Sequence, residues 1–308
     1  MIFQHKDCSK ELNNANLYLS YGEKNAFALI LFMYETISKN SDLVILDDPI
    51  SSFDKNKKYA IINKLFKGEN SFRNNTVLML THDFDPIVDM VKNFTSKFNE
   101  IKTNAYFIYN KKGNIIEKEI YYNSIKTFIE IAKENILILD NNINKLIYLR
   151  RLYEIYDSKG LEWNLLSNLF HKRKEPIISK KIGEIKQEAV MEYCEIEKAT
   201  QKIRELIENF DYDTELDKLL SNELLIKAYN QSKNNYEKLQ IYRIIKNENS
   251  SNDIIKKFVN ETYHVDNDYL FQLNPFDYEI IPDYIIEECD NDLIESGFSI
   301  EESALNFV

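Results

Sequence analysis

Residues Asp42–Asp54, which read DLVILDDPISSFD, constrain the fold of this chain more than any other stretch. The four apolar residues 43–46 predict a short buried strand of a parallel sheet. Two carboxylates, Asp47 and Asp48, follow at its carboxyl end, where open α/β sheets place their ligands. Acids at that edge are suited to holding Mg²⁺ beside a nucleotide and to positioning water. A core strand ending in a polar turn explains the same residues. The flanking sequence distinguishes this alternative from a nucleotide site.

The upstream flank predicts a helix that begins beside a ligand. Ser20 and Glu23 are suited to opening a helix over 23–38, and Gly22 lets the backbone approach a ligand closely. The start of a helix presents free N–H groups and the positive end of the helix dipole, which together favour a phosphate.

The downstream flank predicts a second short strand at 76–80, which ends in Thr81-His82-Asp83. His82, just past that strand, would be within reach of a terminal phosphate or an attacking water; a structural histidine is the alternative. Each of the three motifs is weak evidence alone. Their order, with one helix or one strand–helix unit between them, makes the set specific for a nucleotide site.

These pieces resemble the carboxyl-terminal half of an ABC-type ATPase domain. The branch they resemble is the SMC-like one of the AAA_13 ATPases and of anticodon-nuclease-type proteins of bacterial phage defence. By this resemblance, Leu19–Glu23 match the ABC signature, so Ser20, Gly22 and Glu23 would lie at the γ-phosphate of an ATP held by an opposing subunit. The match that carries motifs covers about residues 15–120.

The same resemblance implies roles for the strand ends. Residues 43–47 match the Walker B strand, with Asp47 on the Mg²⁺ side, and Asp48 takes the place of the usual catalytic glutamate. Residues 51–54, ending in Asp54, match the D-loop that communicates across the dimer interface, and His82 matches the switch histidine. ATP and Mg²⁺ are the cofactors that the resemblance implies.

Two departures from the family pattern stand out. Asp48 is one methylene shorter than glutamate, so a general base here would reach its water less well and turn over slowly. The Gly-x-x-x-x-Gly-Lys-Ser/Thr phosphate loop (Walker A) is absent, because none of the six glycines is followed by Lys-Ser or Lys-Thr. We therefore expect another chain to supply that half, or the chain to be a truncated product or a fragment; ATP hydrolysis is expected only if that half is supplied.

Composition is that of an ordinary globular protein, with 44% hydrophobic and 29% charged residues. No apolar run approaches the roughly 20 residues that span a bilayer, and the amino terminus has no secretory pattern. Three widely spaced cysteines, Cys8, Cys194 and Cys289, fit a reducing cytoplasm and argue against disulfides or a zinc site built from cysteines.

The net charge of −11 is concentrated at the carboxyl end. Residues 258–308 contain 13 Asp and Glu and no Lys or Arg, which leaves 39 basic and 37 acidic residues before them. This segment would repel nucleic acid and dock on a basic surface of a partner or of this chain, or it is a solvated acidic face.

The order of elements predicts an α/β fold: a partial ABC-type ATPase lobe over 1–122, followed by a mainly α-helical domain over 123–308. Asp54 is expected to cap a helix reaching about Phe66, followed by the strand at 76–80 and a helix at 86–98. Strands at 104–109 and 115–120 should form a hairpin through Gly113. From about residue 124, the apolar spacing predicts helices to about 259, the first with Ile125 on its face.

Three candidate sites fall in the helical part. Arg150, Arg151 and Glu154, with His171 further on, resemble the Arg, Glu and His set that some anticodon-nuclease relatives use to cleave RNA. A helix-surface ion pair and a basic patch explain them equally simply. The basic cluster 171–174, with Lys180 and Lys181 nearby, is compatible with nucleic-acid phosphates, a solvated loop or a dock for the acidic end. The third, 260–264, resembles part of a HEPN-type ribonuclease motif, but Val259 stands where its arginine should be, so a hydrogen-bonded structural His264 is favoured.

These expectations lead to an ATP-binding, SMC-like half-domain that gates a partner in phage defence, as one side of a head-to-tail ATPase dimer. The alternative is an ATP-switched ribonuclease with its active site in the helical domain. No membrane partner is expected.

Overall fold

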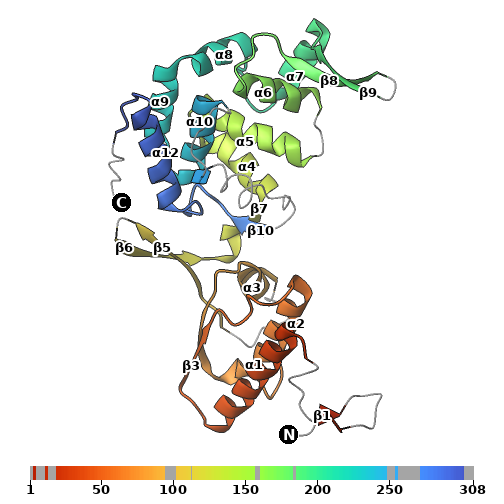
Figure 1. Ribbon diagram of the computed structural model, residues 1–308, viewed down its shortest axis with the longest axis vertical. Helices are drawn as coiled ribbons and strands as arrows, with labels where there is room; N and C mark the ends of the chain where they lie inside the picture. The colour runs from red at the N-terminus through yellow and green to blue at the C-terminus, as the bar shows by residue number, and fades with distance from the viewer. Residues whose placement is uncertain are drawn as a thin grey trace. The chain divides into compact units, whose positions relative to one another are not determined.

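The computed structural model describes residues 3–4, 11–12, 19–93, 102–111, 113–156, 160–182, 185–247, 254–255 and 271–301. The chain forms two units: Met1–Tyr106 with Glu119–Tyr122, and Phe107–Lys118 with Asn123–Val308. Small sheets and helices build the first and helices dominate the second, which confirms the predicted α/β class with a helical region (Figure 1).

The smaller unit contains these elements, in chain order: β1 (Phe3–Gln4), β2 (Glu11–Leu12), α1 (Tyr21–Ser38), β3 (Leu43–Asp47), α2 (Lys55–Phe66), the 3₁₀ turn η2 (Phe72–Asn74), β4 (Thr76–Leu80), α3 (Asp85–Ile87) and the π-helical segment η3 (Val88–Asn93). Helices α1 and α2 and strands β3 and β4 match the predicted elements to within about two residues. The helix predicted at 86–98 instead is a short α-helix that continues as a π-helix, and 94–98 lie outside the described residues.

Strands β3 and β4 form a parallel pair connected through α2. Leu43 lies opposite Thr76 and Asp47 opposite Leu80, so the two carboxyl ends are aligned. The core of this unit is on one face of that pair, where α1 and α2 contribute buried residues beside β3: Met33, Val44, Leu46, Ile50, Phe53, Ile61, Ile62, Leu65, Phe66 and Phe72.

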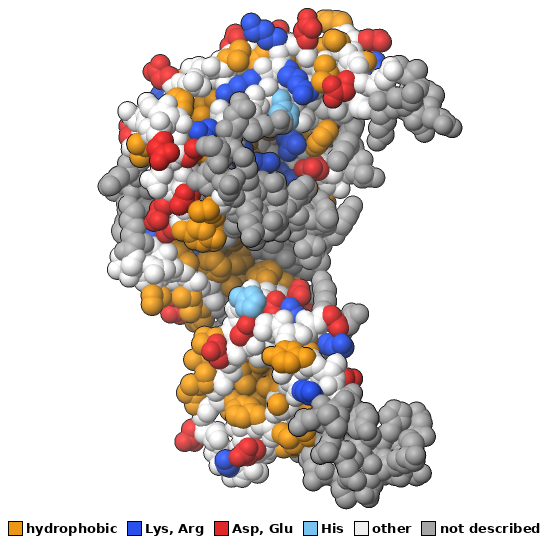
Figure 2. Space-filling model, in the orientation of Figure 1, with side chains coloured by type: hydrophobic (Ala, Val, Ile, Leu, Met, Phe, Trp, Pro, Cys, Tyr) orange, Lys and Arg blue, Asp and Glu red, His pale blue; other side chains and the backbone are white. Residues whose placement is uncertain are grey.

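Among the described residues, none covers the opposite face of the β3–β4 pair, and we call it the open sheet face. It carries Leu43, Ile45, Leu78 and Leu80, whose exposed fractions are 52%, 56%, 48% and 42%. The prediction of a fully buried strand is therefore wrong for half of its side chains, because only Val44 and Leu46 face the core. Figure 2 shows exposed hydrophobic side chains on this unit.

The predicted hairpin is present as β5 (Ala105–Lys111) and β6 (Asn114–Ile120). Gly113 has φ +84°, the left-handed conformation that a tight turn needs and that glycine adopts without strain. Its N–H donates to the Asn110 side chain at 2.9 Å, which closes the turn.

The larger unit continues with η4 (Tyr122–Ser124) at its boundary, then β7 (Ile125–Thr127), α4 (Phe128–Ile138), α5 (Asn142–Ile155), α6 (Leu161–Phe170), β8 (Ile177–Ile182), β9 (Ile185–Val190), α7 (Tyr193–Arg204), α8 (Tyr212–Leu220), α9 (Asn222–Gln231), α10 (Asn235–Lys246), β10 (Phe271–Leu273) and α12 (Asp283–Glu295). Two expectations are wrong here. Ile125 lies in a strand that pairs with Leu273 of β10, and the β8–β9 hairpin interrupts the predicted run of helices.

Part of the acidic end docks on this same unit. On α12, Asp292 accepts a hydrogen bond from the Tyr242 hydroxyl at 2.7 Å and pairs with Lys246 at 2.6 Å, both from α10. Asp290 accepts from the Tyr229 hydroxyl of α9 at 2.7 Å. For α12, one of these three contacts is to a basic residue and two are to tyrosine hydroxyls, so docking on a basic surface stays a prediction. Residues 258–270 lie outside the described residues.

Replacing Tyr242 with phenylalanine should destabilise the larger unit by about 1–3 kcal/mol. The change leaves the buried Asp292 carboxylate with one partner fewer, and hydrogen bonds to charged groups contribute more than neutral ones. Urea unfolding followed by the fluorescence of Trp163 measures the loss. Tyr284→Phe on α12, at a side chain 55% exposed, is the matched control and should be neutral; equal effects of the two changes would contradict this role.

Replacing Glu237 with glutamine should stabilise the protein at neutral pH. Burial raises the pKa of the Glu237 carboxyl, which is 1% exposed and accepts one hydrogen bond from Asn144 at 2.8 Å. For a raised pKa, the stabilising contribution is present at low pH and is lost as pH rises through the folded-state pKa. The midpoint temperature of thermal unfolding should therefore decrease less steeply between pH 4 and pH 7 in Glu237→Gln than in the wild type. The exposed control Glu295→Gln should show the same pH dependence as the wild type.

Among the helices that the structure describes, none combines the length and the apolar character that crossing a bilayer requires.

Candidate functional site

Two of the predicted site residues, Asp48 and His82, meet at the aligned ends of β3 and β4, beside Asp47. The Asp48 N–H donates to the Leu80 carbonyl oxygen at 2.8 Å, which fixes the residue after β3 against the end of β4. His82 Nδ1 then lies 3.0 Å from Asp48 Oδ2. A carboxylate that orients an imidazole at a strand end is an arrangement suited to handling a proton of bound water.

The two adjacent carboxylates differ in their surroundings. Asp47 ends β3 as an exposed side chain. Asp48 has φ +48°, in the left-handed region that residues other than glycine rarely adopt, and its side chain is 34% exposed. This backbone conformation turns the chain sharply after β3, so that Asp48 contacts His82.

The start of α1 is formed as the sequence predicts. The Ser20 hydroxyl accepts from the Glu23 N–H at 3.3 Å, and Glu23 Oε2 accepts from the Ser20 N–H at 2.8 Å and from its hydroxyl at 2.7 Å. These hydrogen bonds from Ser20 lower the pKa of the exposed Glu23 carboxyl. A helix with such a reciprocal cap at its start keeps a fixed, solvent-accessible N-terminus.

Gly22 lies against the loop that follows β3. A Cβ at this position would be 3.8 Å from the Phe53 ring and 3.9 Å from the Ser52 carbonyl oxygen, which are ordinary contact distances. The fold of this chain therefore does not by itself require glycine at position 22. Asp54 caps α2 by accepting from the Lys57 N–H at 3.1 Å, as predicted.

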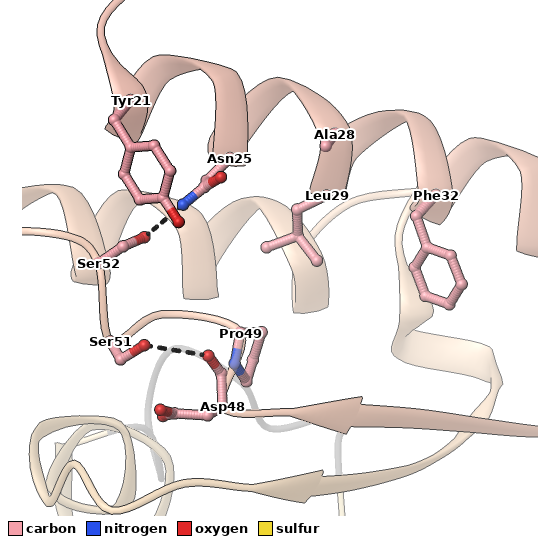
Figure 3. A pocket seen from close by; sticks show the side chains of 9 residues that line it. All are labelled: Tyr21, Asn25, Ala28, Leu29, Phe32, Asp48, Pro49, Ser51 and Ser52. Carbon is pink, nitrogen blue, oxygen red and sulfur yellow. Dashed lines mark hydrogen bonds between the residues drawn. The ribbon is translucent and has the colours of Figure 1, made fainter.

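A pocket of about 470 Å³ opens between α1 and the loop after β3. Figure 3 shows Tyr21, Asn25 and Leu29 on the α1 side, with Asp48 and the loop serines opposite. Asn25 Nδ2 donates to Ser52 Oγ at 3.0 Å across the pocket. The predicted signature helix and the predicted catalytic loop thus line the same hollow.

The sequence did not indicate the contacts that support the segment after β4, where His82 lies. Lys58 of α2 pairs with Asp83 at 2.7 Å, and both side chains are largely buried. The Thr81 hydroxyl accepts from the Asp83 N–H at 3.0 Å and makes a long contact of 3.5 Å with Asp48 Oδ1. The polar triplet Thr81-His82-Asp83 was visible in the sequence, but nothing in it indicated Lys58 as a partner.

The first candidate site of the larger unit consists of ion pairs and a contact between a cation and an aromatic ring. Arg151 pairs with Glu154 at 2.8 Å and Arg150 lies 4.0 Å from it, while the Arg150 guanidinium stacks on the Trp163 ring at 5.3 Å. Burial lowers the pKa of Arg150.

In the basic cluster, Lys180 pairs with Glu195 at 3.0 Å, and Arg173 donates to Asn168 at 3.2 Å. Figure 2 shows Lys and Arg side chains on this unit interspersed with Asp and Glu. The motif at 260–264, including His264, lies outside the described residues.

The chain is similar over part of its length to proteins of known sequence. It is 33% identical over 103 residues to the phosphonates import ATP-binding protein PhnC of Fusobacterium nucleatum subsp. nucleatum, an alignment that covers 33% of this chain and 38% of that protein. It is 27% identical over 162 residues to the uncharacterized chromosomal cassette SCCmec type IVc protein CR006 of Staphylococcus aureus strain MRSA252, covering 39% and 23% of the two chains. No family model and no solved structure matches. The similarity to an ATP-binding protein is therefore partial and distant, and the chain spans less than two fifths of the length of either relative.

Proposed function

We propose that this chain is the signature-bearing half of an ABC-type ATPase and binds ATP together with a half that carries the phosphate loop. The observation that carries the proposal is the meeting of Asp48 and His82, 3.0 Å apart, beside Asp47 at the aligned ends of two parallel strands. The similarity to PhnC, which is named an ATP-binding protein, supports ATP as the nucleotide.

Each residue has a role in this proposal. Asp48 accepts a proton from, or polarises, the water that attacks the terminal phosphate, and His82 donates to that phosphate. Ser20 and the N–H groups at the start of α1 bind the phosphate of an ATP held by the opposing half, where the helix dipole favours negative charge. Gly22 leaves space for that phosphate. This role would explain a glycine at a position where the fold itself has room for a larger side chain.

The carboxylate of Asp47 fits a Mg²⁺ ligand, because it is exposed and has no hydrogen-bond partner among the residues that the structure describes. A hard oxygen donor of this kind is what Mg²⁺ takes in proteins, and the ion would neutralise phosphate charge. We propose that Asp54 transmits the closing of the two ATPase halves across the interface between them. It caps α2 directly after the loop that contacts α1.

The open sheet face supports a partner that completes the domain. Parallel sheets are normally covered on both faces, yet Leu43, Ile45 and Leu78 are about half exposed. A second half that adds strands and a helical layer would bury these side chains. A lobe over 1–122 that requires such a half, followed by a helical domain over 123–308, is the organisation we propose, with the ATPase halves arranged head to tail.

We further propose that closure of this assembly gates a partner in the phage-defence context of the SMC-like AAA_13 branch. This part rests on the resemblance of Leu43–Asp54 to that branch.

Purification of the tagged chain from its native host, with ATP and Mg²⁺ present, tests the proposed function. We expect a stoichiometric partner whose sequence contains Gly-x-x-x-x-Gly-Lys-Ser/Thr, identified by mass spectrometry. Ile45→Asp on the open sheet face should release it, whereas Ile294→Asp, at an isoleucine of the larger unit with nearly the same exposed fraction, should not. Recovery of a folded chain with no such partner and no nucleotide would contradict the proposal.

The ribonuclease alternative places chemistry in the larger unit, where Arg151, Glu154 and the stacked Arg150 lie close together. It predicts that His171→Ala or His264→Ala abolishes the activity of the assembly. If Asp48→Asn silences the assembly and neither histidine change does, the alternative is wrong.

A further inference from the structure

Three metal-ligating side chains converge where β3 and β4 end. Asp48, His82 and Asp83 each offer one ligand atom, and these three atoms lie within 4.8 Å of one another. The closest pair, Asp48 Oδ2 and His82 Nδ1, is 3.0 Å apart. The residues come from two chain segments that the hydrogen bond between the Asp48 N–H and Leu80 holds together.

The Asp83 carboxylate provides a second, independent observation. Its Oδ1 atom is paired with the Lys58 ammonium at 2.7 Å. Its Oδ2 atom is buried and has no hydrogen-bond partner in the part of the chain that the structure describes. A buried acceptor left unsatisfied costs about 1–3 kcal/mol, so a water or an ion bound at Oδ2 would remove that cost.

We propose that Asp48, His82 and Asp83 form a binding site for a divalent transition-metal ion. The ligand set is one imidazole nitrogen and two carboxylate oxygens, which suits Zn²⁺, Mn²⁺, Fe²⁺ or Co²⁺ better than Mg²⁺ or Ca²⁺, because those two ions prefer oxygen ligands only. The site shares Asp48 and His82 with the proposed nucleotide chemistry. It differs in that it needs no ATP and does not use Asp47, so the two proposals are tested separately.

The geometry is close to what an ion requires. Ligand atoms about 2.1 Å from one ion are at most about 4.2 Å apart, so side-chain rotations that move these atoms by less than about 1 Å complete the set. Lys58 acts on the far oxygen of Asp83 and so orients Oδ2, as hydrogen-bonding partners behind metal ligands commonly do. Three protein ligands leave at least one position open for water or a phosphate oxygen.

Calorimetric titration of the chelator-treated full chain with Zn²⁺, without nucleotide, tests this site. We expect one equivalent to bind, and His82→Gln or Asp83→Asn to weaken binding at least about 100-fold. Lys58→Met should weaken it about 10- to 100-fold, because Asp83 loses its orienting partner. His82 is 72% exposed, so His82→Gln leaves the core intact even if Asp83→Asn impairs folding.

The controls are His171→Gln and Asp42→Asn, which replace the same residue types elsewhere in the chain. Both should bind Zn²⁺ as the wild type does. Absence of binding to the wild type, or binding that is unchanged in both His82→Gln and Asp83→Asn, would overturn the site. Either result would leave the proposed ATP chemistry untouched, because that chemistry is measured by nucleotide turnover.

Discussion

Asp48→Asn is expected to lower ATP turnover by the assembled halves about 10²- to 10⁴-fold, the range that a positioned general base contributes. Asparagine keeps the shape of the side chain and its contact with His82 but does not accept a proton from water. The steady-state rate of phosphate release, at saturating ATP and Mg²⁺, measures the effect. Binding of the partner should be unchanged, because Asp48 does not lie on the open sheet face.

Asp42→Asn is the matched control for this change. It removes a carboxylate at the opposite end of β3, where the side chain is exposed, and should leave turnover within about twofold of wild type. Turnover that survives in Asp48→Asn would show that the phosphate-loop half performs the chemistry alone, and the assigned role of Asp48 would then be wrong.

Leu46→Ala should cost the smaller unit about 2–5 kcal/mol and leave it largely unfolded. Leu46 is 4% exposed in the single core that α1 and α2 form over β3, so alanine leaves a cavity as well as losing buried apolar surface. Amide hydrogen exchange in α1 and β3 measures the loss directly. The one tryptophan, Trp163, belongs to the larger unit and would not report it.

Leu43→Ala makes the comparison decisive, because it removes the same atoms from the other face of the same strand. Leu43 is 52% exposed, so the change should alter the stability of the isolated chain by no more than about 0.5 kcal/mol. In the assembly, the same change should weaken partner binding if the open sheet face is the interface. Equal destabilisation of the isolated chain by the two changes would mean that this face is already covered.

The local elements around the candidate site were predictable because their signals are short-range. A run of apolar residues followed by acids predicts β3, and Ser20 with Glu23 predicts the capped start of α1. The turn through Gly113 was predictable for the same reason, since only glycine adopts its positive φ without strain. Asp48 and His82 were each expected just past the end of a strand, and parallel strands joined by a helix end at the same edge of the sheet. Their direct contact was not predicted.

What could not be predicted depends on partners distant in the sequence. Ile125 has helical spacing, but its pairing with Leu273 makes it a strand, and that pairing is non-local. The ion pair between Lys58 and Asp83 joins α2 to the loop after β4, so neither segment indicates it alone. The exposure of Leu43 depends on what covers the sheet, which a four-residue apolar run does not encode.

ATP turnover by this chain mixed with a purified phosphate-loop partner tests whether the two halves form one ATPase. We expect hydrolysis that requires both chains and Mg²⁺, and that falls sharply when Ser20 is replaced by alanine or Asp48 by asparagine in this chain. Hydrolysis by the partner alone, at a rate that neither addition of this chain nor either substitution changes, would contradict it.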